Sequence, residues 1–107
     1  MKIKVKNYTL SPKRIFAGVR GSIGSVQFEM SFGKEWEGYE KSVVFRAPNG
    51  ATACVSCEGG TVRVPDEIMN ARGKIRFAAV GVAGDKRRMT LPAEMYVLGT
   101  VDGVTEK

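Results

Sequence analysis

The sequence predicts an all-β protein, an antiparallel β-sandwich of about seven to eight short strands with one short helical turn. Apolar and polar residues alternate along many short segments, and turns rich in Gly and Pro separate these segments at near-regular intervals. Helical periodicity is almost absent, and a small barrel is the alternative architecture. The 107 residues suit a single domain, which we expect over residues 1–99, followed by a polar tail at residues 100–107.

The N-terminal part predicts two strands. Residues 2–10 begin with lysines that alternate with apolar residues, a pattern typical of a half-buried strand with a solvated lysine face. Because lysines discourage pairing between exposed sheet edges, we expect this strand at the edge of a sheet. Pro12 interrupts the pattern, and residues 14–19 form a short second strand.

The clearest alternation lies at residues 26–32, which we assign to a core strand. Trp36 follows in a loop and is expected to plug one end of the sandwich, with stacking on a sugar or a base as the alternative. Later strands supply further apolar residues. The predicted structural core consists of Val26, Phe28, Met30, Phe32, Trp36, Phe45, Ile75 and Phe77.

The middle of the chain predicts a hairpin. A strand over residues 42–47 precedes Asn49-Gly50, and Asn-Gly between strands is the strongest short-range hairpin signal because both residues tolerate positive φ. The return strand covers residues 51–56. A Gly-Gly turn then leads to a short strand over residues 61–64.

The last third predicts one helical turn and two long strands. Pro65 pre-sets the first φ of a helical turn over residues 65–69, whose first turn carries acidic residues. Residues 74–82 form an apolar-rich strand that we expect in a central position. A tight turn at Gly84-Asp85 leads to the final strand, residues 88–98, which Pro92 interrupts.

The formal net charge of +6 favours contact with anionic partners, since surplus cations attract nucleic acid and acidic protein surfaces. The cations are dispersed, so a role in solubility is the competing interpretation. The candidate partner-binding residues are Lys2, Lys4, Lys6, Lys86, Arg87 and Arg88. The alternating N-terminus is unlike a secretory signal, and no apolar run is long enough for a membrane span, so we expect folding in a cytosol and no membrane partner.

The absence of histidine argues against an enzyme, because histidine is the commonest general base and the usual partner of a catalytic Ser or Cys. The acidic residues are scattered or lie in turns, so we expect no catalytic residues and no cofactor. Cys54 and Cys57 have the spacing of a redox motif but follow a strand instead of opening a helix. Structural zinc needs four ligands, so we expect no metal, one thiol inside the fold and one near the surface.

Three blocks of sequence, in this order, resemble a known family. The first comprises VQFEMSF (residues 26–32), EWEG (35–38) and KSVVFR (41–46). The second is VRVPDEIM (62–69), and the third is GKIRF (73–77) followed by VGV (80–82) and GDKR (84–87). Over residues 23–98 the chain resembles the immunoglobulin-like domain of tailed-phage and prophage structural proteins, such as the N-terminal domain of the baseplate upper protein.

The resemblance implies an immunoglobulin-like sandwich in a virion, made in the bacterial host cytoplasm, that binds other phage structural proteins near the tail or baseplate and forms homo-oligomers. It also implies that Trp36 is a packing residue. Three other functions remain open. A small phage-encoded accessory binding protein could use the same sandwich, since a fold does not fix function. A nucleic-acid-binding module would use the same cations with Trp36, Tyr39 or Phe16 as stacking platforms, whereas a carbohydrate-binding module would need exposed aromatic rings.

Overall fold

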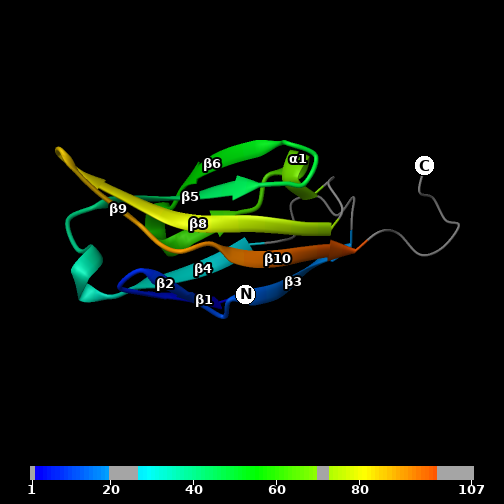
Figure 1. The fold of residues 1–107 in the computed structure, drawn as a ribbon. Coiled ribbons are helices and arrows are strands. Elements are labelled where there is room, and N and C mark those ends of the chain that lie inside the picture. The colour runs from blue at the N-terminus through cyan, green and yellow to red at the C-terminus, as the bar shows by residue number, and fades with distance from the viewer. Residues whose placement is uncertain (1, 20–26, 70–72, 99–107) are drawn as a thin grey trace, which may run out of the picture.

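The computed structural model describes residues 2–19, 27–69 and 73–98, which form two mixed β-sheets and one short helix (Figure 1). The predicted core residue Val26 and the predicted tail at residues 100–107 lie outside the described residues. The all-β prediction is therefore confirmed at the level of a two-sheet, mostly β protein.

The smaller sheet has four strands in the order β2-β1-β4-β7. β1 (Lys2–Lys6) pairs antiparallel with β2 (Thr9–Ser11) and parallel with β4 (Gln27–Phe32), and β7 (Thr61–Arg63) closes the other side. Side chains alternate along β1 and β4, with every second residue buried. One face of this sheet therefore belongs to the core, and the other carries polar and charged side chains.

The prediction of one edge strand over residues 2–10 is wrong. Asn7 adopts a left-handed conformation with φ of 53°, and this turns the chain back on itself so that the segment forms a hairpin of β1 and β2. Asn tolerates this region better than most residues, because its short side chain forms local hydrogen bonds. β1 consequently lies inside the sheet, between β2 and β4.

The larger sheet has six strands. Its path runs through β3 (Arg14–Val19), β10 (Ala93–Leu98), β8 (Gly73–Ala83), β5 (Glu40–Arg46) and β6 (Thr52–Ser56), and β9 (Lys86–Met89) pairs with the end of β8. The predicted central position of the strand at residues 74–82 is confirmed, since β8 pairs with β10, β5 and β9.

The purely antiparallel sandwich of seven to eight strands is a second wrong prediction. β1 and β4 run parallel, as do β3 and β10, so both sheets are mixed, and the described residues contain ten strands. The predicted final strand splits into β9 and β10 around Pro92, which has no backbone N–H. At the break, the Leu91 N–H donates to the Tyr8 carbonyl of the other sheet's hairpin at 2.8 Å.

Short turns connect the strands largely where the sequence predicts them. Gly50 has φ of 93° in the β5–β6 hairpin, and the Asn49 side chain accepts a hydrogen bond from the Ala51 N–H at 3.0 Å. The predicted helical turn is present as α1 (Asp66–Met69). Two 3-10 turns, η1 (Lys34–Trp36) and η2 (Glu58–Gly60), complete the connections.

The core lies between the two sheets, and its centre is aromatic. Phe28 of β4 packs against Phe45 of β5 and Phe77 of β8, with ring centroids 6.1 and 5.2 Å away. Of the other predicted core residues described, Met30, Trp36 and Ile75 are buried. Phe32 is only half-buried, because it lies at the end of β4 where the sandwich opens.

Trp36 fills this open end of the sandwich. Its side chain is completely buried, and its ring lies directly over Gly81 of β8, where a Cβ would approach Trp36 Cζ3 to 2.9 Å. Tyr39 Cβ lies on the same side, 3.1 Å from that position. Because Gly81 has no side chain, the Trp36 indole packs directly against the β8 backbone.

This close approach predicts that Gly81→Ala destabilises the fold by about 1–3 kcal/mol, the usual cost of overpacking a core. Chemical denaturation measures the loss. Val82→Ala, at the exposed neighbouring position, is the matched control and should change stability by less than about 0.5 kcal/mol. An unchanged unfolding midpoint in Gly81→Ala would contradict the packing of Trp36 on β8.

Candidate functional site

Arg88 lies at the open end of the sandwich, beside Trp36. β9 alternates its side chains, and the register that opposes Arg88 to Gly81 turns Arg88 inward. The guanidinium carbon is 4.9 Å from the centre of the Tyr8 ring, 5.6 Å from Trp36 and 5.9 Å from Tyr39. Arg88 Nη1 donates to the Glu35 carbonyl at 2.9 Å. The cation is thus enclosed by three aromatic rings.

The same end carries hydrogen bonds that join η1 to the β1–β2 hairpin. The Asn7 N–H donates to the Glu35 carboxylate, and Trp36 Nε1 donates to the Asn7 carbonyl at 3.0 Å. Arg88 Nε is buried and has no hydrogen-bond acceptor, so the aromatic faces supply its only compensation. We call Asn7, Tyr8, Glu35, Trp36, Tyr39 and Arg88 the end cluster.

The end cluster changes the interpretation of two sets of candidate residues. Arg88 is half-buried and already contacts three rings and the Glu35 carbonyl, which argues against its expected role in binding a partner. Trp36 is completely buried and offers no face to a base or a sugar. Tyr39 is half-buried between Trp36 and Arg88, with the Trp36 and Tyr39 ring centroids 6.3 Å apart.

Arg88→Ala is predicted to lower the free energy of unfolding by about 1–3 kcal/mol, because it removes the cation from three rings and leaves the Glu35 carbonyl without its donor. Arg87→Ala is the matched control, since Arg87 is the exposed neighbour on the same strand. Denaturant midpoints of the two variants measure the difference. Equal midpoints would show that the cluster contributes nothing to the fold.

The end cluster also makes stability depend on pH. The hydrogen bond from the Asn7 N–H holds the pKa of the Glu35 carboxyl below its ordinary value of 4.5, and the Arg88 and Lys6 charges act in the same direction. A carboxyl with a lowered folded-state pKa stabilises the fold above its unfolded pKa, and this stabilisation is lost as pH falls through the folded value.

Glu35→Gln should therefore be less stable than the parent protein at neutral pH, and this gap should narrow as pH falls below the ordinary carboxyl pKa. Thermal midpoints across a pH series measure the gap. Glu37→Gln, at an exposed carboxylate of the same loop, should show no such convergence. A constant gap between Glu35→Gln and the parent would contradict the ionised contact with Asn7.

The remaining candidate cations lie at two separate places. Lys2, Lys4 and Lys6 are exposed in one row on the outer face of the four-stranded sheet, where Lys2 is opposite Glu29 and Lys4 lies between Ser11 and Ser31. An open hollow of about 600 Å³ lies along Lys2 and Lys4. This row is a polar surface with surplus positive charge.

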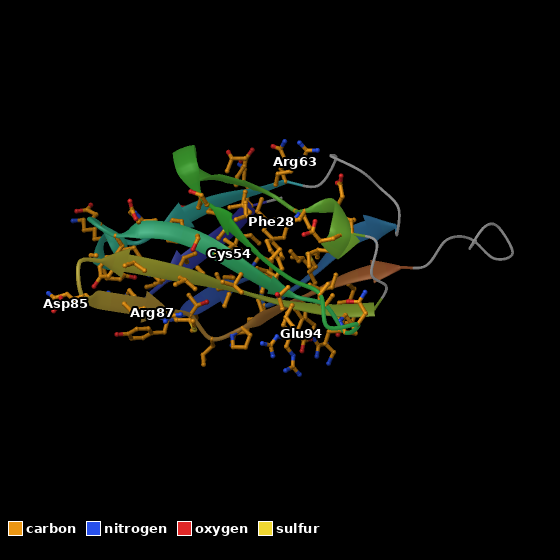
Figure 2. All side chains as sticks on the ribbon, turned by 90° about the horizontal axis from the view of Figure 1, so that it is seen from above. Phe28, Cys54, Arg63, Asp85, Arg87 and Glu94 are labelled. Atoms are coloured by element: carbon orange, nitrogen blue, oxygen red, sulfur yellow. The ribbon has the colours of Figure 1, made fainter. Side chains whose placement is uncertain are left out.

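Lys86 and Arg87 are exposed at the β8–β9 hairpin, at the end of the molecule where Figure 2 shows Asp85 and Arg87. They border the outer face of the six-stranded sheet, away from the lysine row. The structure therefore does not bring the candidate partner-binding residues together into one site.

A different feature occupies the outer face of the six-stranded sheet. Two adjoining open hollows, of about 580 and 490 Å³, share Ser42, Cys54 and Val82 as lining residues. Val44, Val80 and Val82 form an apolar floor, in which Val82 is 43% exposed, Val44 is half-buried and Val80 is buried. The rim is polar and contains Glu40, Lys41, Asp85, Lys86 and Arg87. We call this surface the outer groove.

The alternation of apolar and polar residues in the sequence does not predict the outer groove. Val44, Val80 and Val82 belong to apolar runs in which both faces of the strand carry aliphatic residues, and such runs do not reveal which face is covered. Met89, opposite Val80 in the register, extends the apolar surface and is 45% exposed. An apolar centre with a polar rim is the usual anatomy of a protein interface.

The two cysteines are free, and Cys54 is exposed whereas Cys57 is buried. Burial raises the pKa of the Cys57 thiol, although the Lys41 charge opposes this effect. A raised pKa leaves the thiol protonated at neutral pH and therefore a poor nucleophile. Cys57 is consequently not activated as the nucleophile of a C-x-x-C redox site.

Within the described residues, no group of three or more His, Cys, Asp or Glu side chains is arranged to hold a metal ion. The same part of the chain has no helix of sufficient length and apolar character to cross a membrane. Comparison of the sequence with protein-family models and with curated proteins finds no match.

Proposed function

We propose that this chain is a non-enzymatic assembly module of a bacteriophage or prophage particle, an immunoglobulin-like sandwich of the tail or baseplate type that acts through protein contacts. The observation that carries the proposal is the outer groove. Val82 of this floor is 43% exposed, Val44 is half-buried and the adjoining Met89 is 45% exposed, whereas Val80 is buried. On the other face of the same strands, Val43 and Ala79 are completely buried. Burial of such a floor by another protein is favourable by roughly 25 cal/mol per Å² of apolar surface.

The sequence resemblance supports the virion setting. Its first block coincides with β4, η1 and β5, its second with β7 and α1, and its third with β8 and the β8–β9 hairpin. These elements contribute Phe28, Trp36, Phe45 and Phe77 to the core. The shared motifs therefore include packing residues, and they also include residues that line the outer groove, such as Ser42, Val44 and Val82.

Nucleic-acid binding is the second candidate, favoured by the row of Lys2, Lys4 and Lys6. Phosphate contacts from such a row would give affinity that falls with salt. The aromatic platforms that single-stranded nucleic acid needs are not provided by Trp36, which is buried, or by Tyr39, which is engaged in the end cluster. We therefore rank this function below protein binding.

The proposal predicts that the chain cosediments with phage particles purified by density gradient from the bacterium that encodes it. Val82→Asp places a charge on the groove floor and should reduce incorporation about tenfold or more, because a buried unpaired carboxylate costs several kcal/mol. Asn49→Asp adds the same charge at the exposed β5–β6 hairpin and should be incorporated normally. Quantitative mass spectrometry of the gradient fractions measures all three proteins.

Absence of the parent chain from particles would overturn the virion assignment. If the isolated protein also carried absorbance at 260 nm that high salt removes, nucleic-acid binding through the lysine row would replace it. Equal incorporation of Val82→Asp and Asn49→Asp would show that the outer groove is not the contact surface.

A further inference from the structure

β6 is the terminal strand of the six-stranded sheet and lies along the upper rim of the molecule in Figure 1. Its five residues, Thr-Ala-Cys-Val-Ser, include no charge and no proline. Natural sheets usually protect an exposed edge with lysine, proline, a bulge or a very short strand, because unpaired N–H and C=O groups recruit further strands. β6 has none of these protections.

The other sheet edges are protected. β2 and β7 are three residues long, and prolines follow both at Pro12 and Pro65. β3 begins with Arg14, and its pairing with β10 shifts register between Tyr96 and Val97. β9, which pairs only with β8, carries Lys86, Arg87 and Arg88. Among the described strands, the contrast singles out β6 as the edge that is open to pairing.

The free hydrogen-bonding groups of β6 can be identified from its pairing with β5. The Cys57 N–H donates to the Lys41 carbonyl at 2.9 Å, and the Ala47 N–H donates to the Ala51 carbonyl at 2.8 Å. Because bonded and non-bonded positions alternate along an antiparallel pair, Ala53 and Val55 use their groups toward β5. The N–H and C=O groups of Thr52, Cys54 and Ser56 therefore point away from the sheet.

We infer that β6 pairs antiparallel with β6 of a second copy of this chain, about a two-fold axis at Cys54. In this register Cys54 faces Cys54 of the second copy, and Thr52 faces Ser56 of the second copy. All three free positions then exchange backbone hydrogen bonds, and the two six-stranded sheets become one continuous sheet. A two-fold contact uses the same surface on both subunits and closes after two copies.

Charge explains why a second copy fits this edge. The chain carries a net charge of +6, so two copies repel one another wherever their cations meet. β6 is an uncharged strand, and its self-pairing places no charged β6 side chain against its symmetry mate. An acidic partner would instead be drawn to the lysine row or to Lys86 and Arg87.

The pairing would also enlarge the outer groove. Cys54 and Ser56 of β6 line the groove, so the two grooves would meet across the axis and present one broader surface to a third protein. In this respect the inference rests on the proposed function. The pairing itself depends only on the strand edge. A single five-residue edge buries well below the roughly 1,200 Å² of a stable interface, so the dimer should be weak and depend on concentration.

Chemical cross-linking tests the pairing directly. Residues directly opposite in an antiparallel pair have Cβ atoms roughly 5 Å apart, within reach of a short bismaleimide that joins two thiols. The purified protein should give a covalent dimer whose yield rises with concentration. The Cys57→Ser variant should give the same yield of covalent dimer as the parent protein. The Cys54→Ser variant should give no covalent dimer, since its remaining thiol, Cys57, is buried.

A matched pair of charge variants separates specific pairing from random collision. Thr52→Lys combined with Ser56→Lys places lysine opposite lysine and should lower the dimer yield about tenfold, as expected for like charges directly opposed. Thr52→Lys combined with Ser56→Glu places lysine opposite glutamate and should preserve or raise the yield. Circular dichroism checks that both variants are folded.

Equal yields from the two charge variants, or a constant monomer mass in sedimentation equilibrium up to millimolar concentration, would overturn the inference. Neither outcome would affect cosedimentation with phage particles, which tests the proposed function separately. Conversely, the chain could form a dimer in solution and yet be absent from phage particles. That result would support the β6 pairing and contradict the proposed role in the virion.

Discussion

The contact of Phe28 with Phe45 and Phe77 joins the two sheets, and the rest of the structure depends on it. Phe28 is the contribution of the smaller sheet to this trio, whereas Phe45 and Phe77 lie directly opposite one another on β5 and β8 with centroids 6.1 Å apart. All three side chains are buried, as Figure 2 shows for the central position of Phe28. Because inward positions are taken by this core, the residues that alternate with them must face solvent, and these residues form the lysine row and the outer groove.

The end cluster closes the sandwich where the aromatic trio does not reach. Two strands of the smaller sheet turn at Asn7 and Tyr8, and this turn is held by the Leu91 N–H and by Trp36 Nε1. Arg88 is half-buried and its Nε is buried, and three rings and one carbonyl compensate for the water that the guanidinium loses. In the sequence, the aromatic residues and Arg88 of the end cluster resemble a binding site. In the structure they stabilise the fold instead.

Local signals in the sequence were sufficient for the strands around Phe28 and Phe45, for the Asn49-Gly50 hairpin and for the helical turn after Pro65. Parallel pairing of β1 with β4 could not be predicted in this way, because it joins strands that are distant in the sequence and depends on packing of the whole sheet. The Asn7 turn has only weak sequence signals. Lys86, Arg87 and Arg88 read as one cationic patch, yet strand alternation separates them, and only the register of β9 against β8 shows that Arg88 is the inward residue.

We therefore propose that outward-facing groups carry the function. Pairing of two copies through the exposed backbone of β6 is the most direct test of this proposal. Residue-resolved amide hydrogen exchange, measured by NMR from low micromolar to millimolar protein concentration, reports on this backbone without any substitution. If β6 pairs between two copies, the N–H groups of Thr52, Cys54 and Ser56 exchange more slowly as concentration rises, while those of β2 and β7 do not change. Exchange at these three positions that is independent of concentration would contradict this pairing.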